Sequence, residues 1–287
     1  MKKTGAGLAR PIVKWVGGKR SSVEHILREL PTKIDTYFEP FFGGGSVFFA
    51  LAAEGRFRRA VLSDACSELI AAHVAVRDDV ESVIVAIRRL GPGRITEPKY
   101  YRIRDSRPLT PAGKAARFLF LNKCGFNGLY RVNSFGKFNV PWGKRTRWLV
   151  DYENLRSVSR ALNGVDLLVA DFQHVAESLF SAKQGDAGYF DPPYLPRTKT
   201  EKFTSYTRSG FGFEHQLRLA RMFGELAEKG VHVVASNADT RTTMRLYGDV
   251  PGTKFLRTHV ARAINSNGKR RGKVGELFIV NPGRSGE

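Results

Sequence analysis

The feature that most constrains the fold is a repeated alternation of short apolar runs with helix-like segments. Each run is rich in β-branched or aromatic residues and ends in a polar residue, and a helical pattern follows it. Such alternation is typical of parallel strands joined by crossover helices. It therefore predicts an α/β fold with a Rossmann-like sheet. The predicted strands cover residues 36–39, 60–64, 165–170, 187–191 and 231–236.

About a hundred residues without such a strand–helix unit separate the second predicted strand from the third. This segment opens with a helical stretch that ends at Leu90, before a Gly91-Pro92-Gly93 breaker. Thr110 can cap a helix that begins at Pro111, and a polar, aromatic loop covers residues 126–148. We predict two domains, a sheet domain of residues 1–72 and 160–287 and a mainly helical insertion of residues 73–159.

The formal net charge of +20, from 47 Lys and Arg against 27 Asp and Glu, is the strongest global signal. So basic a chain attracts a polyanion, and nucleic acid is the expected partner, although a merely solvated basic surface would carry the same charge. No stretch approaches the roughly 18 apolar residues of a membrane span, and the first ten residues lack the apolar core of a signal peptide. We expect a cytoplasmic protein, monomeric and without membrane contact.

The two cysteines, Cys66 and Cys124, form no Cys-x-x-Cys pair, and no nearby pair of histidines accompanies them. We therefore expect reduced, structural thiols and no metal site.

A glycine-rich segment, Gly43-Gly44-Gly45, follows Glu39-Pro40-Phe41 at the end of the first predicted strand and precedes a helix predicted from Val47. Glycines at such a turn let a ligand approach the backbone closely. Asp64 ends the next strand, 19 positions after Gly45, where a carboxylate can accept hydrogen bonds from ribose hydroxyls. These residues predict an adenosine site. A nicotinamide dinucleotide or a plain strand-to-helix turn would also fit, but no third spaced glycine follows for a pyrophosphate.

Near the N-terminus, the segment Lys14-Trp15-Val16-Gly17-Gly18-Lys19 superficially resembles a phosphate loop. That pattern requires glycine where the chain has Val13 and Ser or Thr where it has Arg20, so the chain does not match it. A surface turn is one interpretation. The alternative is that Trp15 supplies an aromatic wall, and Lys19 a cation, for a donor molecule that carries a carboxylate.

The tetrapeptide Asp191-Pro192-Pro193-Tyr194 ends the fourth predicted strand and suits the methylation of a planar amine. Exocyclic amines of bases are poor nucleophiles, because their lone pair is delocalised into the ring. Hydrogen bonds from the amine to the Asp191 carboxylate and the Pro192 carbonyl would direct the lone pair at a methyl group. The prolines fix the backbone, and the Tyr194 ring can stack on a base extruded from a duplex. A rigid polar turn is the alternative.

Two stretches without an acidic residue are typical of a nucleic-acid surface. Residues 122–150 combine six Lys or Arg with six aromatic residues, which are Phe126, Tyr130, Phe135, Phe138, Trp142 and Trp148. Residues 262–273 carry further cations in a predicted hairpin loop around Ser266-Asn267-Gly268. The candidate DNA contacts are Lys14, Phe126, Asn127, Leu129, Arg131, Asn133, Asn139, Lys144, Arg145, Asn267 and Arg270.

Together, these motifs resemble the DNA adenine methylase family of the D12 class, in the order donor loop, target-recognition insertion and catalytic motif. The resemblance extends from Pro11 to Pro282. The matching segments are Lys14-Trp15 with Gly17-Gly18-Lys19, Glu39-Pro40-Phe41 with Gly43 and Gly45, Asn127-Gly128-Leu129 with Arg131, Phe138-Asn139-Val140-Pro141, Asp191-Pro192-Pro193-Tyr194 and Ser266-Asn267-Gly268.

The resemblance implies a methyltransferase fold and transfer of a methyl group from S-adenosylmethionine to adenine N6 of duplex DNA. In relatives that recognise GATC, the residues matching Arg131 and Lys14 each read a guanine. Phe126 departs from the tyrosine often found at its position, so the ring that would enter the duplex is retained and the hydroxyl is lost. A restriction endonuclease is a further candidate partner. The residues implied to bind the donor are Trp15, Lys19, Glu39, Phe41, Gly43, Gly45, Asp64, Asp171, Phe172 and Asp191.

Three other functions remain open at this point. The methyl acceptor could be an RNA base or a protein glutamine, because either presents a planar amine or amide. The chain could be a DNA-binding module with an inactive site. A nicotinamide oxidoreductase is the third alternative, although the Asp-Pro-Pro-Tyr motif argues against it.

Overall fold

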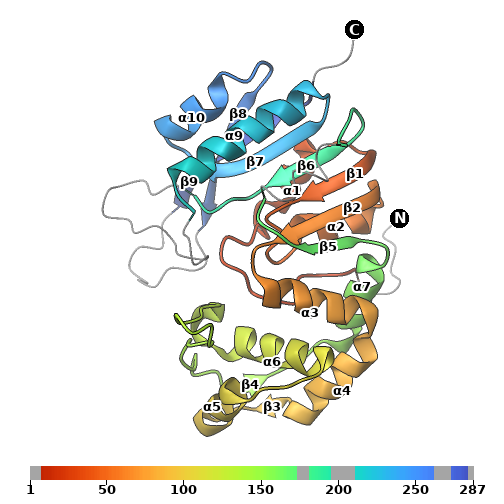
Figure 1. Ribbon diagram of the computed structural model, residues 1–287, viewed down its shortest axis with the longest axis vertical. Helices are drawn as coiled ribbons and strands as arrows, with labels where there is room; N and C mark the ends of the chain where they lie inside the picture. The colour runs from red at the N-terminus through yellow and green to blue at the C-terminus, as the bar shows by residue number, and fades with distance from the viewer. Residues whose placement is uncertain (1–7, 173–180, 195–210, 262–272, 284–287) are drawn as a thin grey trace. The chain divides into compact units, whose positions relative to one another are not determined.

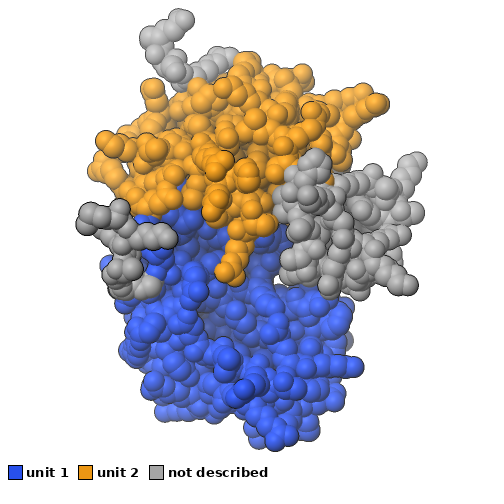
Figure 2. Space-filling view, turned by 180° about the vertical axis from the view of Figure 1, so that it is seen from behind, with its two compact units in different colours: residues 1–18, 43–53, 66–167 blue, residues 19–42, 54–65, 168–287 orange. Residues whose placement is uncertain are grey.

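The computed structural model describes residues 8–172, 181–194, 211–261 and 273–283. The chain divides into two compact units (Figure 2). Unit 1 consists of residues 1–18, 43–53 and 66–167, and unit 2 of residues 19–42, 54–65 and 168–287. This division follows spatial contacts and differs from the functional boundaries at residues 72 and 160, which stay a prediction.

The main sheet has seven strands, in the order β5-β2-β1-β6-β7-β9-β8 (Figure 1), and all of them belong to unit 2 except the first two residues of β5. Five of the strands follow the order 3-2-1-4-5 of a doubly wound fold. They confirm the five strands predicted from the sequence, and with them the α/β, Rossmann-like fold class. The strands are β1 (Ile34–Glu39), β2 (Phe57–Asp64), β5 (Asp166–Val169), β6 (Ala187–Phe190), β7 (His232–Ala238), β8 (Lys254–Ala261) and β9 (Lys273–Asn281).

Strands β2, β1, β6 and β7 pair in parallel, and the sheet continues from β7 into an antiparallel pair, β9 and β8. These two strands were not among the five predicted ones, although a hairpin loop was predicted between them. Strand β9 pairs antiparallel with β7, and β8 pairs antiparallel with β9 along its whole length. Charged and polar residues interrupt β8 at Arg257 and Thr258, so it lacks the continuous apolar run of a buried strand. The hairpin turn predicted at residues 266–268 lies outside the described residues.

Unit 2 is completed by three described helices, α1 (Val23–Glu29), α9 (Phe213–Glu228) and α10 (Arg241–Gly248). Helix α9 packs against β7, and α10 packs against α9 (Figure 1). The core between them is apolar, and all of β7 after its first residue is buried, as expected for a strand in the middle of a sheet.

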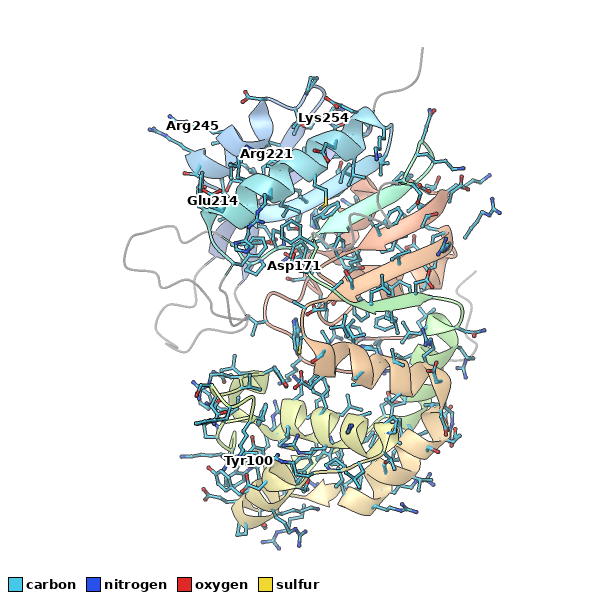
Figure 3. The ribbon with its side chains drawn as sticks, viewed as in Figure 1. Tyr100, Asp171, Glu214, Arg221, Arg245 and Lys254 are labelled. Atoms are coloured by element: carbon cyan, nitrogen blue, oxygen red, sulfur yellow. The ribbon has the colours of Figure 1, made fainter. Side chains whose placement is uncertain are left out.

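Unit 1 is mainly helical, and α6 lies at its centre. Helix α6 packs against α3, α4 and α5, and most of its residues are buried, which is why its sequence is apolar on nearly every side. Tyr100, labelled in Figure 3, donates a hydrogen bond from its hydroxyl to the Val140 carbonyl at 2.9 Å and ties the insertion together. The elements are α2 (Ser46–Glu54), α3 (Ser67–Asp78), α4 (Val80–Leu90), β3 (Gly93–Arg94), α5 (Glu97–Asp105), α6 (Pro111–Cys124), the 3-10 helix η1 (Phe126–Gly128), β4 (Arg147–Trp148) and α7 (Tyr152–Leu162).

Helix boundaries in unit 1 agree with the local signals. The Thr110 hydroxyl accepts a hydrogen bond from the Gly113 N–H at 3.1 Å, and Pro111 occupies the first turn of α6. Helix α4 ends at Leu90 because Gly91 adopts the left-handed conformation, with φ of 69°. Both boundaries were predicted.

The cysteines Cys66 and Cys124 are free thiols, and burial raises the pKa of Cys124 to about 11. In the part of the chain that the structure describes, no helix has the length and apolar character needed to cross a membrane.

Replacing Thr110 by Ala should remove the cap of α6 and lower the free energy of unfolding by about 1 kcal/mol. The loss should appear as a lower urea midpoint in circular dichroism. Thr146→Ala serves as the matched control, because Thr146 is exposed and begins no helix. Equal midpoints for the two variants would contradict the capping role.

Candidate active site

The carboxyl ends of the parallel strands carry the acidic residues that the sequence singled out. Glu39 ends β1, Asp64 ends β2, and Asp191 follows β6 directly. Asp171, labelled in Figure 3, lies two residues beyond β5. Because β1 and β6 are neighbours at the point where the strand order reverses, ligands are expected to bind at this edge.

Asp191 belongs to a largely buried network of four polar side chains within unit 2. The Lys19 ammonium lies 2.7 Å from Asp191 Oδ1 and 3.4 Å from Glu276 Oε1. The Tyr194 hydroxyl donates a hydrogen bond to the same Glu276 oxygen, and the ammonium lies 5.1 Å from the centre of the Tyr194 ring. Two predicted catalytic residues and one predicted donor-binding residue are thus in contact.

Glu276 is the member of this network that was not predicted. Its carboxylate also accepts a hydrogen bond from the Ser22 hydroxyl at 3.4 Å. A sequence signal for it exists, because a glutamate directly before the apolar run Leu277-Phe278-Ile279-Val280 has to be paired if that run is a buried strand.

Burial sets the protonation of this network. It raises the pKa of Asp191 to about 6, while the ammonium of Lys19 acts in the opposite direction. Burial, with the nearby charges of Asp191 and Glu276, also raises the pKa of Tyr194 well above its usual value. Tyr194 therefore keeps its proton, and Asp191 becomes an acceptor once the pH exceeds its pKa.

The remaining predicted donor residues of unit 2 occupy two environments. Glu39 is buried and accepts a hydrogen bond from the Tyr37 hydroxyl at 2.8 Å. The Phe41 ring stacks on Phe172, with centroids 5.5 Å apart, and both rings contact Phe211. Phe172 is part of the apolar core.

Within unit 1, the Trp15 ring lies against the glycine-rich loop. Gly43 has φ of 51°, and a Cβ atom at this position would lie only 2.8 Å from Trp15 Cδ1. Gly45, with φ of 69°, precedes helix α2. Trp15 also stacks on the Tyr130 ring, with centroids 6.1 Å apart. The loop and ring are therefore fitted to each other, and glycine is required at position 43.

The aromatic residues of the insertion divide into surface and core, which corrects the expectation that all six face nucleic acid. Phe126 and Phe135 are exposed. Phe138 and Trp148 are buried, and Tyr130 packs between the rings of Trp15 and Phe138. Sequence composition cannot separate the two groups, because an aromatic ring suits a protein core as well as a base.

Most of the predicted DNA contacts in unit 1 are exposed and basic or carry amides. Arg131 donates from Nε to Asn139 Oδ1 at 2.7 Å. Asn133 Oδ1 instead accepts from two backbone N–H groups, those of Phe135 and Lys137, and shapes a turn. The other exposed or partly exposed members are Lys14, Asn127, Leu129, Lys144 and Arg145.

Two of these residues lie close enough to influence each other electrostatically. Partial burial, and secondly the charge of Arg145, lower the pKa of Lys14. Two like charges held together at a surface favour the binding of an anion. Asn267 and Arg270 lie outside the described residues, among which no cluster of potential metal ligands occurs.

Asn122 is a further residue that the predictions missed. It is buried, and its Oδ1 accepts from the Lys14 N–H while its Nδ2 donates to the Lys14 carbonyl, both at 2.7 Å. Its Nδ2 also donates to the Gly128 carbonyl at 3.2 Å. One side chain thus fixes two segments that carry predicted DNA contacts.

Comparisons with known proteins agree on one family. The model of the family described as D12 class N6 adenine-specific DNA methyltransferase matches residues 15–264. The type II methyltransferase M1.LlaDCHI of Lactococcus lactis subsp. cremoris is 38% identical over 96% of each chain. Type II methyltransferase M.MjaIII of Methanocaldococcus jannaschii is 35% identical, over 95% of this chain and 99% of the relative. The DNA adenine methylase of Escherichia coli K12 is 34% identical, over 94% and 95%.

Replacing Asn122 by Leu should loosen the segment around Lys14, because the polar backbone groups of that residue would lose their partners. Two lost hydrogen bonds at about 1 kcal/mol each should speed tryptic cleavage after Lys14 by roughly 30-fold. The matched control is Asn154→Leu, since Asn154 binds the N–H and carbonyl of Arg10 in the same manner at an exposed site. Cleavage after Lys14 at equal rates in both variants would contradict the anchoring role.

Proposed function

Because the chain belongs to the D12 class of N6-adenine-specific DNA methyltransferases, we propose that it methylates N6 of an adenine flipped out of duplex DNA, with S-adenosylmethionine as donor. The observation that carries this proposal is the position of Asp191. Asp191 directly follows β6, which lies beside β1 at the point where the strand order reverses, and Tyr194 follows three residues later.

The chemistry required of Asp191 is to accept a hydrogen bond from the adenine amine. This bond, with a second to the Pro192 carbonyl, would hold the amine so that its lone pair points away from the ring plane. When bound, S-adenosylmethionine supplies the methyl group from its sulfonium sulfur. The carboxylate of Asp191 would stabilise the positive charge that develops on the nitrogen as the N–C bond forms and the C–S bond breaks, and the nitrogen would then release one proton to water.

The residues assigned to the donor fit its chemical groups. The carboxylates of Asp64 and Asp171 lie at neighbouring strand ends and suit hydroxyl and amine donors. The stacked rings of Phe41 and Phe172 offer an apolar surface beside them. At Gly43, a Cβ atom would collide with the Trp15 ring, so glycine lets the indole pack closely on the loop assigned to the donor.

For the DNA, we propose that the exposed cations of unit 1 bind the phosphates and that Arg131 and Lys14 read guanines of a GATC site. Phe126, which is 43% exposed, would be the ring that enters the duplex when the adenine leaves it. Some relatives bear the name type II methyltransferase, which supports a restriction endonuclease as partner of this chain. We place the activity in the cytoplasm, where the DNA of such a system lies.

The experiment that tests this proposal is the mapping of N6-methyladenine in the DNA of a methylation-free bacterial host that expresses the chain. Methylated adenines within one short sequence are expected. Expression of Asp191→Asn is the control, because an amide is a weaker acceptor and carries no charge. Unmodified adenine with the wild-type chain would overturn the function, and methylation outside GATC would overturn only the assigned site.

The rate of methyl transfer should depend on pH through Asp191. The acceptor is the carboxylate, and its pKa is about 6, so at saturating substrates the rate should be constant above that pH and fall about tenfold per unit below it. Lys19→Met should move this fall to higher pH, because the ammonium lowers the pKa of Asp191. A rate that stays constant down to about pH 5 would contradict the role of Asp191.

Replacing Arg131 by Ala should reduce discrimination at one guanine. A bidentate contact to a guanine is worth about 1–3 kcal/mol, so the preference in kcat/KM for the cognate over the singly substituted site should drop by that amount. Lys137→Ala, an exposed cation of the same loop, should weaken both substrates equally. The same equal loss in Arg131→Ala would make that residue a phosphate contact.

A further inference from the structure

We infer that Gln216 is a positioning residue for methyl transfer, which holds the Asp191–Tyr194 segment in place, and that Asn237 sets the orientation in which it does so. This inference rests on the proposed function of that segment. Neither residue lies in one of the motifs found in the sequence, and neither is among the residues assigned to binding the donor or DNA.

The need for such a residue follows from the two prolines. Pro192 and Pro193 have no N–H group, so this segment can be anchored there only through its carbonyl oxygens. Gln216 Nε2 donates a hydrogen bond to the Pro193 carbonyl at 2.8 Å. That carbonyl belongs to the peptide group that joins Pro193 to Tyr194. The hydrogen bond therefore fixes the orientation of this peptide group, and with it the position of the Tyr194 backbone.

The orientation of the Gln216 amide is determined by a short chain of hydrogen bonds. The Ala238 N–H, which can only donate, binds Asn237 Oδ1 at 2.8 Å. Asn237 Nδ2 must then face the other way, and it donates to Gln216 Oε1 at 2.9 Å. Gln216 is left with its Nε2 toward the proline carbonyl. A backbone donor on β7 thus decides which end of the amide meets the active-site segment.

The surroundings make this arrangement stable and specific. Gln216 and Asn237 are essentially inaccessible to solvent, at 0% and 1% exposure, so water cannot replace a missing partner. Gln216 lies in the first turns of α9, and Asn237 lies near the end of β7, the strand that pairs with β6 immediately before Asp191. The other buried residues of α9 belong to the apolar core of unit 2.

Gln216→Met tests the hydrogen bond, because methionine has nearly the same length and shape but no donor. We expect kcat to fall about 10- to 100-fold, the usual effect of a small misplacement of reacting groups, with KM for DNA changed less than threefold. Asn237→Asp should lower kcat to a similar extent, although residue 237 makes no hydrogen bond to Pro193 itself. Its second oxygen would face Gln216 Oε1 and turn the amide, so that an oxygen faces the Pro193 carbonyl.

The double variant Gln216→Met with Asn237→Asp separates the two roles. If Asn237 acts only through Gln216, the double variant should be no slower than Gln216→Met alone. The matched control is Asn281→Leu, because Asn281 is another buried amide whose Nδ2 donates to a proline carbonyl, that of Pro251, at 2.9 Å. This variant should lower the melting temperature and leave kcat unchanged.

Each outcome bears on one proposal. A Gln216→Met enzyme whose kcat stays within twofold of wild type overturns the inference, as does an Asn281→Leu enzyme with the same loss of kcat. If Gln216→Met does not fold, Asn237→Asp decides, and an unchanged kcat in that variant is equally decisive against the inference. The proposed function fails separately, if the wild-type chain transfers no methyl group to adenine or if Asp191→Asn retains full activity.

Discussion

Parallel pairing is the constraint on which the arrangement of the site depends. Because β1, β2, β6 and β7 run in the same direction, their carboxyl ends lie at one edge of the sheet. Glu39, Asp64 and Asp191 come from distant parts of the chain. The direction of their strands brings them to that edge, and no contact between their side chains is required. The apolar core beneath them holds the strand ends in register, so the stability of the sheet is also what keeps the carboxylates in place.

The charge balance of the Asp191 network suits the reaction of this family. Lys19, Asp191 and Glu276 together bring one ammonium and two carboxylates into a largely buried place. A buried surplus of negative charge is unfavourable on its own and is relieved by a positive partner. In the proposed transfer, positive charge would pass from the sulfonium of the donor to the adenine amine. The surplus of negative charge would be complementary to that positive charge before and during the reaction. On the proposed function, the ion pair of Lys19 with Asp191 would keep the carboxylate ionised until the adenine amine binds to it.

How much the sequence predicted depends on the distance along the chain between interacting residues. The five predicted strands, the cap at Thr110 and the position of the Asp-Pro-Pro-Tyr segment directly after β6 were predictable, because each depends on a few consecutive residues. Glu276, Asn122 and Gln216 were missed, because their partners are far away: Tyr194 is 82 positions from Glu276, and Lys14 is 108 positions from Asn122. Exposure was also not predictable from composition. Phe138 and Trp148 were predicted to stack on bases but are buried in the core, whereas Phe126 and Phe135 are exposed.

The fit between Gly43 and Trp15 has a consequence for how this family can diverge. A side chain at position 43 would collide with the indole, and its backbone conformation is one that glycine alone adopts without strain. A smaller ring at position 15 would remove the collision but would also remove the packing on Tyr130. Neither position can therefore drift by single substitutions. The pair should persist unchanged or be exchanged together, so variation at these two positions among descendants of this sequence should be correlated.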